Sequence, residues 1–289
     1  MYENEILLVE KLLESYPVEW RRNYYNNKKT LKINKIDELD SILDTVQGTY
    51  DEEKNLITLY SDTAIIHELF HSCFRDGEKL NKQIKEKSSY CYCNGIAMKN
   101  KTTNIKFGVA LTEGFVEYVS RKISGSKGCE FEYFIVDLLI SIYGEDILKY
   151  PFTNDVSEFY EDERFYKIVE LMIATDLCYI YWEYIKSNLK LANKIIETKI
   201  ETKDIDDKLN KIMIDIKKMM KKFYIQIIEC IKIIIQEYKK SKYQMIEKND
   251  FILKIKQFLV NPDYQVIATL LSFDKYDLNK EVQKILKKI

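Results

Sequence analysis

The chain has only two histidines, and both belong to one short motif, His67-Glu68-Leu69-Phe70-His71. Residues four apart on a helix lie one turn apart on the same face, so both imidazoles can bind one tetrahedral zinc ion. Glu68 is displaced from the ligand positions, but its carboxylate can accept a proton from a metal-bound water, which the metal makes more acidic. The motif therefore predicts metal-assisted activation of water. The alternative is a purely structural pair of buried, hydrogen-bonded histidines.

A catalytic zinc ion also needs a third protein ligand and one open position for water or substrate. Because no third histidine exists, this ligand must be Asp, Glu, Cys or Tyr. One known arrangement has Gly three residues past the second histidine and the third ligand six residues past it, but Phe74 and Gly77 stand there. Asp76 is close in sequence, yet it would need an unusual turn to reach the metal.

The better candidate for the third ligand lies in the segment Leu111-Thr112-Glu113-Gly114-Phe115-Val116-Glu117-Tyr118. Glu113 opens a predicted helix, and Glu117 follows one turn later on the same side. We expect Glu113 to bind zinc and Glu117 to accept the free ring N–H of His67 or His71, which fixes the orientation and tautomer of that ligand. Without the histidine motif, both carboxylates would be interpreted as solvated helix residues.

Together, the histidine motif and the run Thr112-Glu113-Gly114-Phe115 with Tyr118 resemble the gluzincins, the zinc peptidases with a glutamate as third ligand. They are similar to the aminopeptidase N family, where Asn-Glu-Gly-Phe supplies the ligand. They are also similar to the thermolysin family, where a carboxylate one turn beyond the ligand Glu supports a ligand histidine. The resemblance covers residues 50–123 and implies zinc-dependent, water-promoted hydrolysis of a peptide bond.

The chain departs from these families in three respects. The interval between the motif and Glu113 is longer than usual, which we assign to an insertion at residues 78–106, and Thr112 stands where Asn is usual. A Gly-Ala-Met-Glu-Asn-like strand is also missing, so exopeptidase activity is not implied. These families stabilise the oxyanion with a Tyr or His, and the spacing does not select among the tyrosine candidates Tyr143, Tyr150, Tyr160 and Tyr166.

Hydrophobic periodicity and turn residues predict the elements that precede the motif. These are a helix at Glu3 to Ser15, a polar stretch at Arg21 to Thr30, a short strand at Leu31 to Ile33, a short helix at Ile36 to Leu43, and two antiparallel strands at Thr45 to Tyr50 and Leu56 to Tyr60.

The motif itself lies on a helix predicted at Thr63 to Arg75, which Ser61 or Asp62 caps and Gly77 ends. The polar, lysine-rich insertion that follows, with residues 90–95 inside it, is expected to be a surface excursion with some local structure. A second helix is predicted at Thr112 to Ile123.

Residues from Glu130 onward show an almost wholly helical pattern, and the longest amphipathic stretch runs from Asp206 to Lys240. Its apolar stripe predicts packing against neighbouring helices, with the lysines in solvent. A helix on a membrane surface or against a partner protein is the alternative.

The composition limits the possible partners and compartments. Lys plus Arg number 45 and Asp plus Glu 46, so no overall field attracts nucleic acid or anionic lipid. Residues 1–10 do not resemble a secretory signal, and no apolar run reaches the roughly 20 residues that span a bilayer. We therefore expect a cytoplasmic protein that has no membrane span and does not bind nucleic acid.

The six cysteines are scattered and form no C-x-x-C pair, which argues against a disulfide framework or a structural zinc knuckle. Cys91 and Cys93 could in principle bind metal, but a single pair at this spacing is a weak signal for a metal site. We interpret most of the cysteines as free thiols.

The prediction is an α+β fold, with a zincin-like catalytic domain at residues 1–150 and a helical region at residues 151–289. Its function is that of a zinc metallopeptidase acting on a peptide or protein substrate, with His67, His71 and Glu113 as metal ligands, Glu68 as catalytic base and Glu117 supporting a ligand. The first alternative is a catalytically inactive zincin-like interaction protein. The second is a deformylase-like hydrolase, which would need a cysteine ligand upstream of the motif, where this chain has none.

Overall fold

The computed structural model describes residues 2–36, 47–86, 88–125, 128–197, 203–242, 244–259 and 278–287. The chain divides into two compact units, Met1–Phe165 and Tyr166–Ile289. Its fold is mixed α+β and mostly helical with small sheets, as the sequence predicts. The division into a catalytic and a C-terminal part after residue 150 stays a prediction.

The first unit contains a three-stranded sheet. Its strand order is β1 (Lys32–Lys35), β3 (Leu56–Leu59) and β2 (Gly48–Asp51). β2 pairs antiparallel with β3, and β1 pairs parallel with it, so the predicted hairpin and the predicted strand near residues 31–33 are confirmed. β2 is an edge strand, and central β3 carries the fully buried Ile57 and Leu59. The helix predicted from Ile36 to Leu43 lies outside the described residues apart from Ile36.

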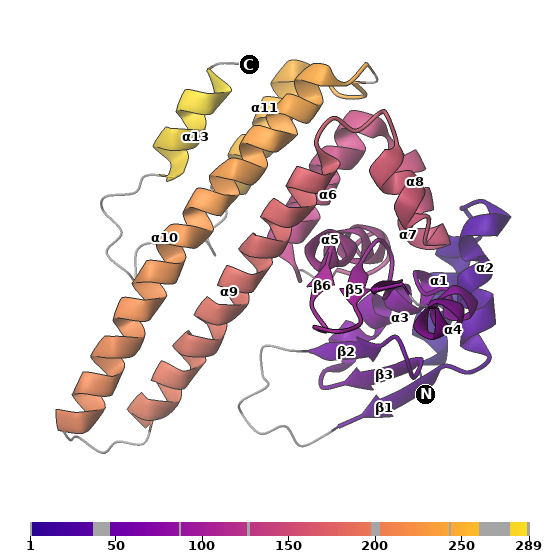
Figure 1. Ribbon diagram of the computed structural model, residues 1–289, viewed down its shortest axis with the longest axis horizontal. Coiled ribbons are helices and arrows are strands. Elements are labelled where there is room, and N and C mark those ends of the chain that lie inside the picture. Colours follow the sequence, from indigo (N-terminus) through magenta and orange to yellow (C-terminus); the bar gives the residue numbers. More distant parts are fainter. Residues whose placement is uncertain are drawn as a thin grey trace. The chain divides into compact units, whose positions relative to one another are not determined.

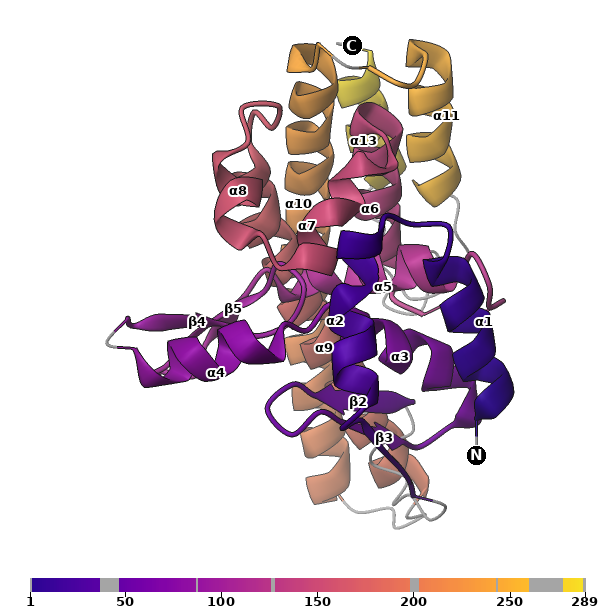
Figure 2. The same ribbon diagram turned by 90° about the vertical axis from the view of Figure 1, so that its right-hand side faces the viewer.

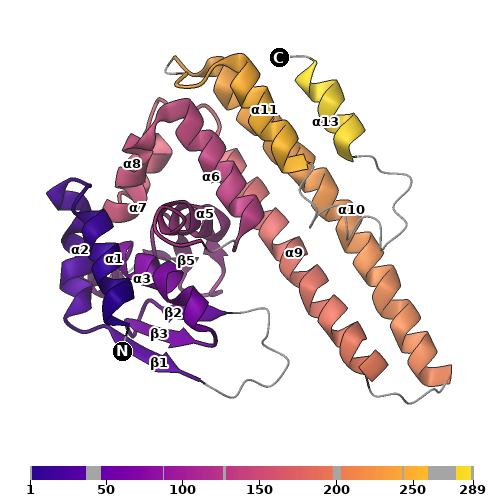
Figure 3. The same cartoon turned by 180° about the vertical axis from the view of Figure 1, so that it is seen from behind.

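The motif helix α3 (Ile65–Cys73) lies in the middle of this unit, where every one of its residues except His67 is buried. It contacts α1 (Glu3–Leu13), α2 (Val18–Lys28) and the strands β2 and β3 (Figures 1 and 3). A helix that is apolar on most sides is stable only when neighbours cover it on most sides. The surrounding elements therefore fix the position of the motif.

Helix α2 occupies most of the polar stretch at residues 21–30, for which the sequence predicted no helix. Tertiary hydrogen bonds explain the difference, because the buried side-chain amide of Asn27 donates to the carbonyl oxygens of Ser72 and Arg75 at 2.7 Å each. Arg75 in turn donates to the Asn27 side chain at 2.7 Å. Polar residues of α2 thus hold the end of the motif helix, a pairing that hydrophobic periodicity does not reveal.

The predicted insertion contains α4 (Gly77–Lys85) and a second antiparallel sheet in the order β4 (Tyr90–Tyr92), β5 (Met98–Asn100) and β6 (Lys106–Phe107). α4 packs beside β4 (Figure 2). The loop between β4 and β5 is buried, including Asn94, Ile96 and Ala97. The prediction of a surface excursion is therefore wrong for this loop.

One helix carries Glu113 and Glu117, and a second helix packs against it. These are α5 (Val109–Ser120) and α6 (Glu130–Tyr143), and the short elements η3 (Glu145–Leu148), α7 (Lys149–Thr153) and α8 (Val156–Glu161) complete the unit. α5 and α6 approach closely at Gly114, where a Cβ atom would lie 2.3 Å from the carbonyl oxygen of Glu132. Only glycine allows this contact, so the residue after Glu113 sets the distance between the two helices.

The second unit is helical, with α9 (Ile168–Glu197), α10 (Lys203–Lys240), α11 (Lys248–Leu259) and α13 (Leu278–Leu286). α10 packs along α9 (Figure 1), and the Trp182 ring stacks on Phe223 with centroids 5.3 Å apart. Several members of the predicted α10 stripe are buried, so core packing is confirmed for Ile216, Met220, Phe223, Ile227, Ile231 and Ile234. None of the helices in the described part of the chain is long and apolar enough to cross a membrane.

Candidate metal centre

The start of the motif helix follows the predicted cap. Ser61 accepts a hydrogen bond from the Thr63 N–H at 3.3 Å, and the 3-10 turn η2 (Asp62–Ala64) leads directly into α3. The predicted stop is wrong, because α3 ends at Cys73 and Gly77 begins α4. Asp76 is the reason: its carboxylate accepts the Lys79 N–H at 3.0 Å and caps the new helix. Asp76 is thus occupied as a cap.

Helix α5 begins at Val109, three residues before its predicted start, and ends at Ser120. Gly108 precedes it in the left-handed region with φ 74°, which a glycine adopts without strain. Glu113 therefore lies more than a turn inside the helix and does not open it. Its backbone is held on both sides by regular helical hydrogen bonds, which gives the side chain a fixed origin.

The structure brings His67, His71 and Glu113 together, with their ligand atoms all within 4.8 Å of one another. Oε2 of Glu113 lies 3.2 Å from Nε2 of His67 and 3.4 Å from Nε2 of His71. Bonds of about 2.1 Å at tetrahedral angles place neighbouring zinc ligand atoms about 3.4 Å apart. Both separations from the Glu113 oxygen therefore fit neighbouring ligands of a tetrahedral zinc ion.

Glu117 lies behind the first histidine, as expected of a supporting carboxylate. Its Oε2 is 3.1 Å from Nδ1 of His67, and its side chain is 1% exposed. Its other oxygen accepts from Nε of Arg121 at 2.7 Å and from the Gly128 N–H at 3.0 Å. Glu117 is consequently fixed at both oxygens, and it directs Nε2 of His67 toward Glu113.

Asn94 lies behind the second histidine, and sequence reasoning missed it. Its Oδ1 is 3.0 Å from Nδ1 of His71, and its Nδ2 donates to the backbone carbonyl of His71 at 2.6 Å. The only local signal is the Asn94-Gly95 pair, which predicts a turn but no contact with a histidine 23 residues earlier. Long-range packing, not spacing, places this residue.

Glu68 is 5% exposed and lies next to the edge strand of the first sheet. A Cβ atom on Gly48 would come within 2.8 Å of Glu68 Cγ and 2.9 Å of its Oε1, so the glycine leaves space for this carboxylate. Burial raises the pKa of Glu68, although the two histidines oppose the rise. A carboxyl group with a raised pKa is suited to exchange protons near neutral pH.

The titration of the cluster reflects its buried charges. Burial alone would lower the pKa of His67, but hydrogen bonds to Glu113 and Glu117 raise it to about 10. Burial alone would raise the pKa of Glu113, but His71 and His67 hold it well below its usual range. The same atoms that attract protons in this way are those that a cation would bind.

The four tyrosine candidates lie in separate environments. Tyr143 packs on Phe165, Tyr150 hydrogen-bonds Asp162, Tyr160 donates to the carbonyl of Ile96 at 3.0 Å, and Tyr166 is 54% exposed in the second unit.

The aromatic ring that packs on a site histidine is a different one, Tyr50. Its ring is nearly parallel to that of His71, with centroids 6.2 Å apart, and its hydroxyl donates to Asn55 at 2.7 Å. The choice of an oxyanion-stabilising tyrosine therefore stays open.

One cysteine, Cys129, lies close to the cluster of His67, His71 and Glu113. Sγ of the half-buried Cys129 lies 4.0 Å from Oε2 of Glu113. Cys91 and Cys93 are buried, and all six cysteines are free thiols, as predicted.

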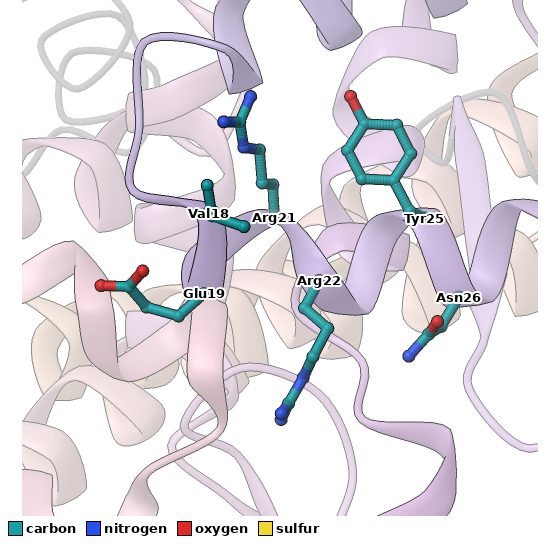
Figure 4. Close-up of a pocket in the computed structure, with 6 residues that line it drawn as sticks. All are labelled: Val18, Glu19, Arg21, Arg22, Tyr25 and Asn26. Carbon is teal, nitrogen blue, oxygen red and sulfur yellow. The ribbon is translucent and has the colours of Figure 1, made fainter.

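A surface hollow beside α2 is separate from this centre. Figure 4 shows its side chains spread along one helix, with Arg21 and Tyr25 directed to one side and Arg22 and Asn26 to the other. Because these groups diverge, they do not form a converging set of ligands. The cluster of His67, His71 and Glu113 is the better candidate for a catalytic site.

Comparison of the chain with protein-family models, with curated proteins and with solved structures found no match.

Proposed function

We propose that the protein is a zinc-dependent peptidase in which His67, His71 and Glu113 hold the metal and Glu68 is the general base. The observation that carries the proposal is the pair of 3.2 and 3.4 Å separations between the Glu113 oxygen and the two histidine nitrogens. The resemblance to the gluzincins agrees with the same three ligands. A zinc ion bound there would supply Lewis acidity toward a carbonyl and would make a water acidic.

The protein's own groups would then handle the proton. Glu68 is adjacent in sequence to the ligand His67 but is not part of the converging set, so its carboxylate is available to take a proton from water. Its burial keeps competing solvent away and raises its pKa, which makes the carboxylate a better acceptor for that proton; the departing amine is more basic still and can take the proton from Glu68. His67 and His71 would keep their orientation because their Nδ1 atoms face fixed acceptors.

The edge strand favours a peptide as substrate. β2 is at the edge of its sheet, and among the described residues only β3 pairs with it. An extended peptide can add to such an edge through backbone hydrogen bonds. Gly48 in this strand lies against Glu68, so a peptide bound along β2 would pass close to the general base.

The test combines metal analysis with digestion of an unbiased peptide library by the purified full-length chain. We expect about one zinc per chain, loss of zinc in Glu113→Ala, and cleavage that a chelator abolishes. Glu68→Gln keeps the side-chain volume and is expected to retain zinc while losing turnover.

Different outcomes identify the alternatives. A wild-type protein that binds zinc but leaves every peptide intact at high concentration would be an interaction protein. Zinc retained at full affinity by Glu113→Ala would exclude the proposed ligand set and favour the deformylase-like hydrolase.

A further inference from the structure

Asn94 lies against Nδ1 of His71, the second histidine of the candidate metal centre. We infer that Asn94 is a positioning residue, and that the loop between β4 and β5 is part of the metal centre through it. The inference rests on the proposed zinc site and adds a residue to it from a segment that the sequence marks only as an insertion.

The orientation of the Asn94 amide follows from its partners. The backbone carbonyl of His71 can only accept a hydrogen bond, so the group 2.6 Å from it must be the donor Nδ2. The amide oxygen must then face Nδ1 of His71, at 3.0 Å. Because an amide oxygen can only accept, Nδ1 carries the hydrogen, and in the neutral ring Nε2 is left with the lone pair that binds a metal.

The loop that carries Asn94 is fixed on several sides. The Gly95 N–H donates to the carbonyl of Phe74 at 2.9 Å, just past the end of α3. The side-chain amide of Asn154 donates to the carbonyls of Phe74 and Gly95 at 2.7 Å each and joins the two segments. Asn94 is itself only 7% exposed. A side chain held this way cannot turn without breaking its neighbours' contacts, so it holds the imidazole in one orientation.

The two histidines consequently have different supports. His67 faces the carboxylate of Glu117, whereas His71 faces a neutral amide. Both supports act at Nδ1 and direct Nε2 to the same Glu113 oxygen. Substituting such a supporting residue typically weakens metal binding by about 10- to 100-fold.

The test is a zinc competition titration of the full chain against a chromogenic chelator, together with the visible spectrum of the cobalt-substituted protein. We expect Asn94→Ala to raise the zinc Kd by at least about 10-fold and to change the cobalt spectrum. Asn94→Asp keeps an acceptor for Nδ1 but loses the donor to the His71 carbonyl, so its zinc Kd should lie between those of wild type and Asn94→Ala. Thr175→Ala is the control, because Thr175 is also buried and donates to the backbone carbonyl of Leu171 at 3.0 Å, in the second unit, which does not contain the histidines. It should lower the melting temperature without changing the zinc Kd.

The results separate this inference from the proposed function. A wild-type chain that binds no zinc overturns both. Zinc binding that is equal in wild type and Asn94→Ala overturns the positioning role and leaves the zinc site in place. If Asn94→Ala does not fold, Asn94→Leu, which keeps the side-chain volume, decides, since wild-type zinc affinity without an amide at this position contradicts the role.

Discussion

Gly114 links helix packing to the position of the third ligand, and replacing it with alanine tests that link. The added Cβ would lie 2.3 Å from the carbonyl oxygen of Glu132, whereas real Cβ contacts essentially never fall below 3.0 Å. The difference between these values requires α5 and α6 to separate by at least about 0.7 Å at this point. Overpacking of this kind costs about 1–3 kcal/mol.

The same displacement affects Glu113, because it is the residue before Gly114. Metal–ligand distances are held within about 0.2 Å, so a shift of the helix backbone by several times that amount should weaken zinc binding. We expect Gly114→Ala to lower both the melting temperature and the zinc affinity, measured by thermal unfolding and by chelator competition.

Gly125→Ala is the matched control, because a Cβ atom there meets nothing within 4 Å. It should leave both measurements unchanged. If Gly114→Ala matched wild type and Gly125→Ala in melting temperature and zinc affinity, the close contact between α5 and α6 could not be what places Glu113.

Three further predictions concern other parts of the chain. Gly48→Ala should reduce peptide turnover and leave zinc content unchanged, because its Cβ would lie 2.8 Å from Glu68 Cγ, and kinetics with parallel metal analysis checks this. Glu237→Gln should destabilise the chain by about 1–3 kcal/mol, since its fully buried carboxylate accepts the Tyr166 N–H at 2.9 Å just before α9; denaturant unfolding measures this, and unchanged stability would contradict the role. Iodoacetamide should label Cys129 first in the folded protein, because the other five cysteines are buried, and peptide mass mapping would expose any other order.

Local patterns were sufficient to predict the elements that carry the proposed metal ligands. Helical spacing predicted a common face for His67 and His71, and the alternation around residues 45–60 predicted the hairpin that became β2 and β3. Helix boundaries were less predictable, since the start of α5 depends on Gly108 and the start of α4 on a cap by Asp76. Single residues set these boundaries, and the hydrophobic periodicity of a segment does not reveal them.

Contacts between distant polar residues were not predictable from the sequence. Asn27 ties α2 to the end of α3, and Asn94 ties the inserted loop to His71. In both cases a side-chain amide satisfies backbone carbonyls near the end of the motif helix, where the last carbonyls lack helical partners. A single sequence marks such asparagines only as turn or surface residues, because the carbonyls that they bind become neighbours only after folding.

The balance of charge explains why a divalent cation suits this centre better than a monovalent one. Glu68, Glu113 and Glu117 bring three carboxylates close to the histidines, and Arg121 pairs with Glu117 at 2.7 Å. With neutral imidazoles, two carboxylates are left without a positive partner in a buried site, where an unpaired charge is costly. Without a cation, protons compensate: burial and the Glu113 charge raise the pKa of Glu68, and hydrogen bonds to Glu113 and Glu117 raise the pKa of His67 to about 10. A doubly charged ion bound between the Glu113 oxygen and the Nε2 atoms of His67 and His71 would replace those protons and balance the remaining charge.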